Sequence, residues 1–472
     1  MKKTKIICSI GPSCMDPNTF FEMVNVGCNV ARINFSHASI EERNKILETI
    51  NTVRNKTDRT IGILYDTKGP EFRNGTVKED GIKLIEGEYI KIVKEDVIGN
   101  EERFSVNHKN AIDSIQIGNE ILLENGLMKL EVVDKTDDYL NCKIITGGIL
   151  ESKKSLSVPG VKLDIPFISK DDYDDIIYAC RNQGNFLALS FVSCKDEVLE
   201  VRKILEKENR LDMKIISKIE SQTGIQNLDT IIEASDGIMV ARGDLGVEIP
   251  MEDLPIWQRK ITNSCRRHGK ICIIATEMLE SMKKNIRPTR AEVTDIANAV
   301  YDGADAVMLS GETTTGIHPI DAVRYMANIC EHIEKSNNNN SIYESDINDK
   351  NVEAIAKSAV ITANDLNAKL IVIPTITGTT ATLVSKLEPK CPILTLTTNK
   401  NVAESLSLYY GIYPLVIDEY KVTEEVFEAS KEKAINFMNL HKNDIIIMTA
   451  GFKTDKNSKE IPKTNLMKIE II

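Results

Sequence analysis

With 472 residues, the chain is too long for one hydrophobic core and predicts two to four domains, since a domain usually holds about 150 residues. Its 42% hydrophobic and 27% charged residues are typical of soluble globular proteins, its formal net charge of −11 argues against non-specific nucleic-acid binding, and no apolar run reaches the roughly 18 residues of a membrane span. The ten Cys stand singly, without a Cys-x-x-Cys pair, so no zinc ribbon or disulfide framework is indicated and a reducing cytoplasm is expected.

The first predicted element is a β-strand over Thr4 to Ile10. The start, MKKTKIICSIGP, superficially resembles a secretory signal, but its apolar run ends at Gly11-Pro12, so a strand is the better interpretation. Seven more strand-like runs alternate with amphipathic segments: Val30 to Phe35, Ile61 to Asp66, Phe186 to Val192, Met213 to Ile219, Gly237 to Val240, Ile271 to Ala275 and Ala306 to Leu309. Eight strands, each followed by a helical stretch such as Glu41 to Arg54 or Asp253 to Arg267, predict an α/β fold, a (β/α)8 TIM barrel over residues 1–69 and 167–340.

Helical periodicity disappears between Pro70 and Pro166. Short runs separated by Gly and Asn take its place: Tyr89 to Val93, Glu120 to Leu123 and Leu140 to Ile145. They predict an all-β domain, a β-barrel over residues 70–166, inserted after the third strand of the large barrel. It would lie over the carboxyl face of that barrel and act as a lid, with Gly69-Pro70 and Pro159 to Pro166 as hinges.

A polar segment, Glu334 to Asp349, follows the eighth unit and predicts a linker or an exposed loop. A second α/β pattern comes after it: Val352 to Asn364 helical, Leu370 to Pro374 strand, Thr380 to Leu387 helical and Ile393 to Thr397 strand. We therefore expect a separate C-terminal α/β domain over residues 350–472.

Lys218, Glu220 and Asp244 stand at the ends of two successive apolar runs. The carboxyl ends of parallel barrel strands meet at one face, and a lysine beside two carboxylates there is an arrangement that binds a divalent cation and steadies a phosphate or an enolate. This points to phosphoryl transfer. The alternative is a buried ion-pair cluster that closes the end of the barrel. The two Gly of Arg-Gly-Asp-Leu-Gly favour a binding site, because they let backbone amides approach a ligand closely.

Other strand ends carry polar groups as well. The second strand ends in Arg32-Ile33-Asn34-Phe35-Ser36-His37, and its alternation places Arg32, Asn34 and Ser36 on one face. The third ends in Asp66-Thr67-Lys68-Gly69-Pro70-Glu71-Phe72-Arg73, and the last two end in Ala275-Thr276-Glu277-Met278 and Ser310-Gly311-Glu312-Thr313. We expect these groups to converge at the carboxyl face.

Six motifs in order, ARINFSH, DTKGPEFR, SKIE, MVARGDLGVEIP, ATEMLESM and MLSGET, resemble the pyruvate kinase family. One short match arises by chance, but six with matching separations cover the whole barrel. The resemblance implies transfer of the phosphoryl group of phosphoenolpyruvate to ADP, giving pyruvate and ATP in the final step of glycolysis. It also implies a homotetramer with an allosteric C-terminal domain.

The resemblance implies roles for individual residues. Glu220 and Asp244 would ligate Mg2+ (or Mn2+), and Lys218 would stabilise the transferring phosphoryl group that Arg32 holds from the other side. Substrate contacts would come from the amides of Gly243 and Asp244 together with Thr276, which would lie near the enolate carbon that takes up a proton. The residues implied for the nucleotide are Asn34, His37, Arg73 and Lys154.

Potassium dependence is the second expectation from the resemblance. Asn34, Ser36, Asp66 and Thr67 match the family's monovalent-cation site and offer hard oxygen ligands. Glu71 supports K+, because relatives that dispense with the ion carry Lys there; the alternative for Glu71 is a solvent-facing salt bridge. Three residues depart from the commoner pattern without removing a ligand: Glu277 for Gln, Tyr65 for Leu and Ser157 for Asn.

The C-terminal domain offers a candidate effector loop. Thr375, Thr377, Gly378, Thr379 and Thr380 lie between a predicted strand and helix, and the family binds a sugar-phosphate activator on a matching loop. A plain helix N-cap is the alternative, and the effector, a sugar phosphate or AMP, stays open. The last loop, Gly451 to Pro462, is lysine-rich, with Lys453, Lys456 and Lys459.

Two rival functions remain. A metal-dependent barrel lyase or aldolase acting on pyruvate enolate would share Glu220 and Asp244, but it would have no use for Lys218 beside a phosphate or for a nucleotide lid. A catalytically inactive effector-binding scaffold would not need a complete set of cation and metal ligands. Met278 and Met282 are expected in the core rather than at a ligand.

Overall fold

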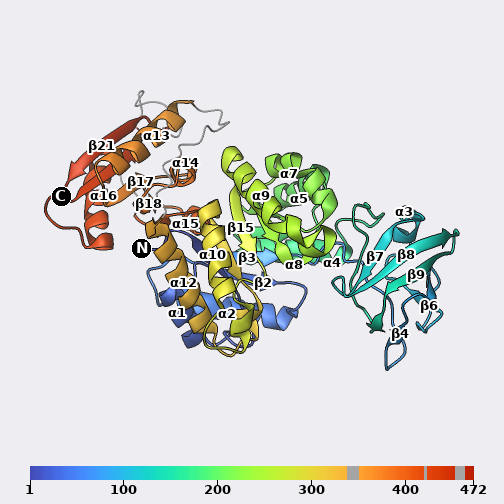
Figure 1. The fold of residues 1–472 in the computed structure, drawn as a ribbon. Coiled ribbons are helices and arrows are strands. Elements are labelled where there is room, and N and C mark those ends of the chain that lie inside the picture. The colour runs from blue at the N-terminus through green and yellow to red at the C-terminus, as the bar shows by residue number, and fades with distance from the viewer. Residues whose placement is uncertain (337–349, 419–422, 452–462) are drawn as a thin grey trace.

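The structure, a computed structural model, describes residues 1–336, 350–418, 423–451 and 463–472. Three bodies follow one another in space: the insert at one end, the large barrel in the middle and the C-terminal domain at the other end (Figure 1). Among the described helices, none combines the length and the apolar content of a membrane span.

Eight parallel strands close the central barrel, which confirms the predicted fold class. They are β1 (Lys5–Ser9), β2 (Val30–Asn34), β3 (Gly62–Asp66), β12 (Phe186–Leu189), β13 (Lys214–Ile219), β14 (Gly237–Ala241), β15 (Ile271–Ala275) and β16 (Ala306–Leu309), and β1 pairs with both β2 and β16. Most of their residues are buried, because the helices cover one face and the barrel interior the other.

The helices that surround the barrel are α1 (Pro17–Val26), α2 (Ile40–Arg54), α4 (Lys170–Arg181), α5 (Lys195–Lys207), α7 (Leu228–Ala234), α9 (Leu254–His268), α10 (Arg290–Asp302) and α12 (Pro319–Ser336). Capping boxes begin several of them: in α4, the Ser169 side chain accepts from the Asp172 amide, while Asp172 accepts from Ser169. The short α6 (Gln222–Gln226), α8 (Arg242–Glu248) and α11 (Gly311–Thr314) follow strands directly.

The insert is an all-β domain with its own apolar core. Its strands are β4 (Ile82–Leu84), β5 (Tyr89–Val93), β6 (Arg103–Ser105), β7 (Glu120–Leu123), β8 (Met128–Lys135), β9 (Tyr139–Thr146), β10 (Gly148–Leu150) and β11 (Leu156–Ser157), with the short helix α3 (Ala111–Ser114). Six of them form a sheet in the order β11-β7-β8-β9-β5-β6, and β10 pairs with β4. Isolated bridges from Arg73 to Ser155 and from Asn74 to Val106 link the two edges of the larger sheet.

A five-stranded sheet in the order β19-β18-β17-β20-β21 forms the centre of the C-terminal domain. The elements in chain order are α13 (Lys350–Asp365), β17 (Leu370–Pro374), α14 (Thr379–Lys386), β18 (Ile393–Thr397), α15 (Lys400–Leu406), β19 (Ile412–Val416), α16 (Thr423–Met438), β20 (Ile445–Ala450) and β21 (Leu466–Ile471). The last strand runs antiparallel to β20, and the other pairs are parallel.

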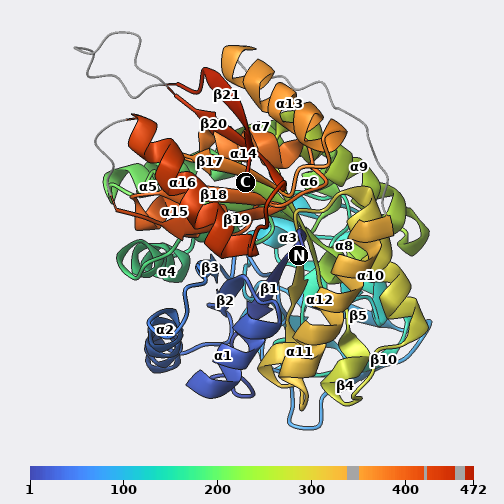
Figure 2. The ribbon, with the colours of Figure 1, turned by 90° about the vertical axis from the view of Figure 1, so that its left-hand side faces the viewer.

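The expected linker begins later than predicted. Glu334 belongs to α12 and is only 8% exposed, because its carboxylate accepts hydrogen bonds from the amides of Thr4 (2.6 Å) and Lys3 (2.7 Å). The expectation of a polar loop from Glu334 onward was therefore wrong for Glu334, Lys335 and Ser336, and the rest of the predicted linker, residues 337–349, lies outside the described residues. This anchor holds the N-terminal segment, which lies beside the C-terminal domain (Figure 2).

The C-terminal domain and the barrel share one continuous apolar core. The same cluster holds Leu64 and Phe186 from barrel strands and Ile371 and Ile412 from the C-terminal sheet. The insert, in contrast, packs around a separate cluster. Packing therefore joins the C-terminal domain to the base of the barrel and leaves the insert as a distinct body.

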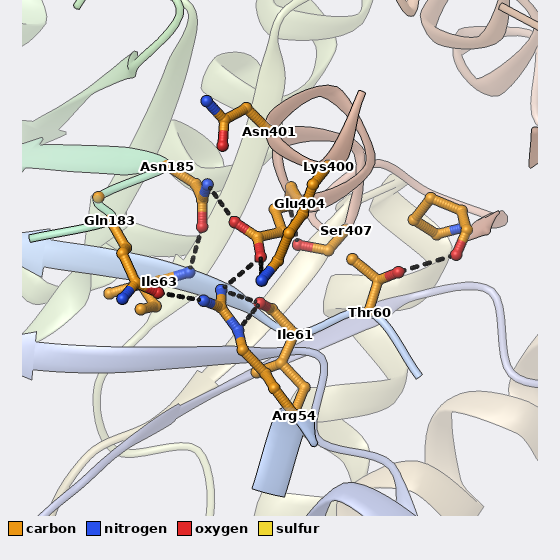
Figure 3. A network of polar contacts seen from close by, with 12 residues as sticks. Arg54, Thr60, Ile61, Ile63, Gln183, Asn185, Lys400, Asn401, Glu404 and Ser407 are labelled. Carbon is orange, nitrogen blue, oxygen red and sulfur yellow. Dashed lines mark hydrogen bonds and ion pairs between the residues drawn. The ribbon is translucent and has the colours of Figure 1, made fainter. Parts of the chain in front are cut away.

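Buried polar contacts also cross the seam between barrel and C-terminal domain (Figure 3). Glu404 on α15 pairs with Arg54 at the end of α2 (3.2 Å) and accepts from the Asn185 side chain (3.1 Å). Arg54 also donates to the carbonyl of Ile61, and Asn185 accepts from the Ile63 amide at 2.8 Å. Both partners of the ion pair are less than 10% exposed, and loss of one partner of such a pair costs about 3–5 kcal/mol. Glu404 thus holds the beginning of β3, the strand whose other end is Asp66.

Candidate active site

A cavity of about 440 Å³ lies at the carboxyl ends of the barrel strands. Most residues that the sequence predicted for the site line it: Arg32, Asn34, Ser36, His37, Thr67, Glu71, Arg73, Lys218, Glu220, Asp244 and Thr276. The expected convergence of strand ends is therefore present in the structure. Of the eighth-strand motif, Ser310 reaches this cavity, whereas the buried Glu312 accepts hydrogen bonds from the amides of Leu279 (3.0 Å) and Ser310 (2.8 Å) and shapes the loop.

A cluster of four charged side chains forms the floor of this cavity. Arg32 contacts the Oδ2 atom of Asp66 at 2.7 Å, and the Lys218 ammonium lies 3.2 Å from the other Asp66 oxygen. Lys218 also pairs with Glu220 at 2.9 Å. The Asp66 and Glu220 side chains are each 1% exposed. This cluster resembles the buried ion-pair cluster that was considered as an alternative for this end of the barrel. Its two cations, however, face a cavity and do not close the end of the barrel.

Burial and neighbouring charge shift the pKa values in this cluster. Burial alone would raise the pKa of Asp66, but Lys218 and Arg32 lower it below its usual value. Burial opposes the charge of Lys218, yet Asp66 and Glu220 together raise its pKa above the usual value, so it stays an ammonium. Burial raises the pKa of Glu220 to about 7, because Lys218 only partly offsets burial and the nearby Asp244 adds to it.

Two residues of this site were missed from the sequence. Ser190 follows β12, accepts a hydrogen bond from the Lys218 ammonium (2.7 Å) and donates to the carbonyl of Thr67 (2.7 Å). The next residue, Phe191, has a positive φ of 57° and donates its amide to Glu220 at 2.6 Å. Ser190 could have been predicted from the sequence, because it lies at the end of the fourth barrel strand. Phe191 could not, because it contacts Glu220 through its backbone amide and the pattern of side chains does not mark such a contact.

The segment after β15 has an unusual backbone. Thr276 and Glu277 both have a positive φ, 70° and 55°, and for a β-branched residue such as Thr276 this conformation stores strain. Arg242 holds the segment by donating to the carbonyl of Thr276 (2.7 Å), while Asp295 fixes the guanidinium at 2.6 Å. The amide of Gly243 donates to the Thr276 hydroxyl at 2.8 Å. The expected neighbours Gly243 and Thr276 are thus in contact, and Met278, as expected, is in the core.

The donor set fits a divalent cation. Glu220 and Asp244 face the same cavity, and hard carboxylate oxygens are ligands that Mg2+ prefers. Within the described ranges, no group of three or more His, Cys, Asp and Glu side chains has the arrangement of a metal cluster. A cation held by these two carboxylates would therefore take its other ligands from substrate or water.

The expected monovalent-cation ligands lie on adjacent strands. Asn34 and Asp66 are register partners in the β2–β3 pair, and Ser36 and Thr67 line the same cavity as Asn34. The Asn34 side-chain oxygen accepts from the Ser36 amide at 3.0 Å. Tyr65, the residue before Asp66, stacks on Phe35 with ring centroids 5.1 Å apart and thereby braces both strand ends.

A second cavity of about 400 Å³ lies between the insert and the barrel. Arg73 and Lys154 line it from the insert, and Glu220 and Asp244 line it from the barrel. Arg73 pairs with Glu71 at 2.8 Å, which is the salt bridge considered for Glu71, and Lys154 pairs with Glu124 at 2.7 Å. His37 and Asn34, also expected at the nucleotide, line the first cavity, which shares Arg73 with the second.

The candidate effector loop has internal hydrogen bonds. The Thr375 hydroxyl accepts from the Gly378 amide at 2.9 Å, and those of Thr377 and Thr379 are 3.0 Å apart. Thr380 is buried against the hydroxyl of Thr464 (2.6 Å). Gly378, with φ 86°, takes the N-cap position of α14 without a side-chain cap. Lys453, Lys456 and Lys459 lie outside the described residues.

The fold and the cavity together define a barrel enzyme that presents fixed cations and paired carboxylates to an anionic substrate. Comparison with known proteins agrees: the family model "Pyruvate kinase, barrel domain" matches residues 1–323, and "Pyruvate kinase, alpha/beta domain" matches residues 353–470. The chain belongs to the pyruvate kinase family. Its reaction is the transfer of the phosphoryl group of phosphoenolpyruvate to ADP, the step of glycolysis that yields pyruvate and ATP.

Several relatives match over the whole chain. The pyruvate kinase of Staphylococcus haemolyticus is 41% identical over 481 residues, covering 100% of this chain and 81% of the relative, and that of Geobacillus stearothermophilus is 40% identical, covering 100% and 80%. Among solved structures, a pyruvate kinase from Cryptosporidium parvum superposes with a TM-score of 0.93 at 38% identity, covering 100% of this chain and 96% of that one. The predicted family, fold class and reaction are thereby confirmed.

The raised pKa of Glu220 predicts how stability depends on pH in metal-free buffer. The folded protein holds the Glu220 proton more tightly than the unfolded chain, so this group's stabilising contribution is present below its unfolded pKa and is lost as pH rises through about 7. We expect Glu220→Gln, which has no proton to lose, to gain thermal stability relative to the wild type as pH rises from about 5 to about 8. Melting temperatures measured with EDTA across this range test it, and a difference that moves the other way contradicts it.

Proposed function

We propose that Lys218 and Arg32 hold the phosphoryl group of phosphoenolpyruvate while it transfers to ADP. The observation that carries this proposal is the pair of cations at the floor of the strand-end cavity, both anchored to Asp66. Anchored cations need no reorganisation when negative charge develops, and this is why such electrostatic groups contribute strongly to catalysis. Lys218 stays charged because carboxylates flank it on two sides.

Glu220 and Asp244 are the residues we propose for Mg2+ or Mn2+. When bound, the ion supplies positive charge that offsets the charge on the phosphate and on the enolate oxygen. Support comes from the raised pKa of Glu220, because burial and the nearby Asp244 make its negative charge costly where, among the described residues, Lys218 is the only cation paired with it. The amide of Gly243 and the hydroxyl of Thr276 lie at the same edge, where they would orient the substrate carboxylate.

Asn34, Ser36, Asp66 and Thr67 are the residues we propose for K+. Their oxygens are hard donors, and Asp66 carries the charge that a monovalent cation needs.

We also propose that Arg73 and Lys154 contact the phosphates of ADP from the insert, with Asn34 and His37 on the barrel side. Closure of the insert over the barrel would exclude water and strengthen each of these interactions.

The match to both pyruvate kinase family models favours phosphoryl transfer over the rival barrel lyase or aldolase. A lactate-dehydrogenase-coupled assay with phosphoenolpyruvate and ADP separates the two, because a lyase produces no pyruvate that depends on ADP.

We further propose a cytoplasmic homotetramer regulated through the loop at Thr375 to Thr380, with a sugar phosphate or AMP as the effector. Light scattering tests the assembly, and kinetics with these effectors tests the regulation.

Lys218→Met should strongly slow phosphoryl transfer and spare metal binding. Losing one transition-state contact of this kind costs about 3 kcal/mol, so kcat should fall by about a hundredfold or more. Mn2+ binding, followed by electron paramagnetic resonance, should persist because Glu220 and Asp244 remain. Lys214→Met is a matched control on the same strand, since Lys214 lies at its other end near Asp236 (3.9 Å). A kcat close to that of the wild type in Lys218→Met would overturn the assignment.

Activity should require potassium. We expect little turnover in sodium- or tetramethylammonium-based buffer and restoration by K+. Glu71→Lys should raise the K+-free activity, because the new ammonium would lie beside the cation ligands, whereas Glu71→Gln should remove the negative charge beside Arg73 without replacing the ion. Full wild-type activity in potassium-free buffer would refute the proposed site.

A further inference from the structure

The contacts that hold the insert against the barrel are few. The insert packs around its own core, so its position depends on contacts at the seam. Within the described parts of the chain, two residues of the 70–166 segment make side-chain hydrogen bonds or ion pairs with the barrel. Lys162 lies near Glu197 (3.5 Å) and Cys194 (3.4 Å), and the Ser157 hydroxyl donates to Glu248. Lys162 belongs to the connecting segment after β11, whereas Ser157 belongs to a strand of the insert itself.

Glu248 connects three parts of the site. It is the last residue of α8, the helix whose first turn carries Asp244. One of its carboxylate oxygens accepts from Ser157 on β11, and the other accepts from the amide of Gln222 at 3.4 Å. Gln222 comes two residues after Glu220. A single carboxylate therefore touches the insert, the segment that follows Glu220 and the helix that holds Asp244.

Close backbone packing surrounds this contact. A Cβ atom on Gly126 of the insert would lie 3.6 Å from Val247, the neighbour of Glu248. A Cβ atom on Gly160, which has a φ of 76°, would lie only 2.7 Å from the Gln222 side-chain oxygen. The insert thus rests on α8 and on Gln222 at the points next to Glu248. We call Ser157, Gln222 and Glu248 the seat.

The seat borders the cavity between insert and barrel. Ser157 and Glu248 line this cavity together with Arg73 and Lys154 on the insert side and Asp244 on the barrel side. Neither Ser157 nor Glu248 lines the strand-end cavity that holds Arg32, Lys218 and Thr276. Burial raises the pKa of Glu248, and the hydrogen bonds from Ser157 and Gln222 favour its carboxylate form. The seat therefore sets the distance between the two walls beside the cavity proposed for the nucleotide, whereas Ser157, Gln222 and Glu248 take no part in lining the strand-end cavity.

We propose that Glu248 is a positioning residue that holds the insert at the spacing required for ADP, by binding Ser157 on the insert and Gln222 beside the metal carboxylates. The proposal rests on the proposed assignment of this cavity to the nucleotide. Loss of the seat leaves each wall intact but lets the spacing vary, so Arg73 and Lys154 no longer face Asp244 at a constant distance. Binding of ADP weakens, while phosphoenolpyruvate keeps its contacts in the barrel.

The test compares Ser157→Ala and Glu248→Ala with variants that preserve the seat. Hydrogen bonds to charged groups contribute about 1.5–3 kcal/mol, so the KM for ADP should rise about tenfold or more in both alanine variants, with the KM for phosphoenolpyruvate within about twofold of the wild type. Ser157→Asn keeps a donor to Glu248 and should leave the KM for ADP near the wild-type value, whereas Glu248→Gln keeps one of the two acceptor oxygens and should give a KM between those of the wild type and Glu248→Ala. Ser152→Ala is the matched control, since the Ser152 hydroxyl accepts from the Val77 amide (2.9 Å) inside the insert.

Hydrogen–deuterium exchange supplies a readout that does not depend on turnover. In Ser157→Ala, peptides around Gln222 and Gly160 should exchange faster, whereas peptides of β8 and β9 in the core of the insert should not change. Lys154→Ala reports separately on the nucleotide assignment: an unchanged KM for ADP in that variant overturns the assignment and with it this proposal. If Lys154→Ala raises the KM for ADP but Ser157→Ala and Glu248→Ala leave it at the wild-type value, the assignment stands and the seat is wrong.

Discussion

The contact between Asp66 and two cations, Arg32 and Lys218, is the interaction on which the candidate active site depends. A carboxylate that is 1% exposed is stable as an anion only when opposite charge surrounds it, and these two cations supply that charge. In return, Asp66 fixes both cations at the cavity floor, while Glu220, which pairs with Lys218, and Asp244, which lines the cavity, add negative charge that suits a divalent cation. The cluster is thus a set of charges held in place for a metal ion and an anionic ligand together.

The remainder of the chain supports this cluster in two different ways. The C-terminal domain shares an apolar core with the barrel, and through Glu404 it holds the beginning of β3, the strand that ends in Asp66. The insert has its own core and makes its polar contacts with the barrel through the seat at Glu248 and, within the described parts of the chain, through Lys162. One side of the site is therefore rigidly supported, whereas the other side is a body whose position depends on a few hydrogen bonds. This arrangement suits an enzyme that admits a nucleotide and then excludes water.

Much of this could be predicted from the sequence. Strands that are buried on both faces appear in the sequence as apolar runs, so all eight barrel strands could be predicted. Because the carboxyl ends of parallel barrel strands meet at one face, Lys218, Glu220 and Asp244 could also be predicted to lie together. The positive φ of Thr276 and the amide of Phe191 could not be predicted, because backbone conformation leaves little trace in residue type. The pairs Arg54–Glu404 and Ser157–Glu248 join residues far apart in the chain, and no local pattern marks them.

A titration of Mn2+ binding to the wild type, Glu220→Gln, Asp244→Asn and the double variant tests whether these two carboxylates together hold one cation. If the two carboxylates hold one cation, each single substitution should weaken Mn2+ binding by about tenfold or more. The double variant should bind Mn2+ only slightly more weakly than the weaker of the two single variants, because the effects of residues that share one ligand are not additive. Wild-type affinity in either single variant would contradict the account, because the cation would then bind elsewhere and the charges around Asp66 would serve only to close the barrel.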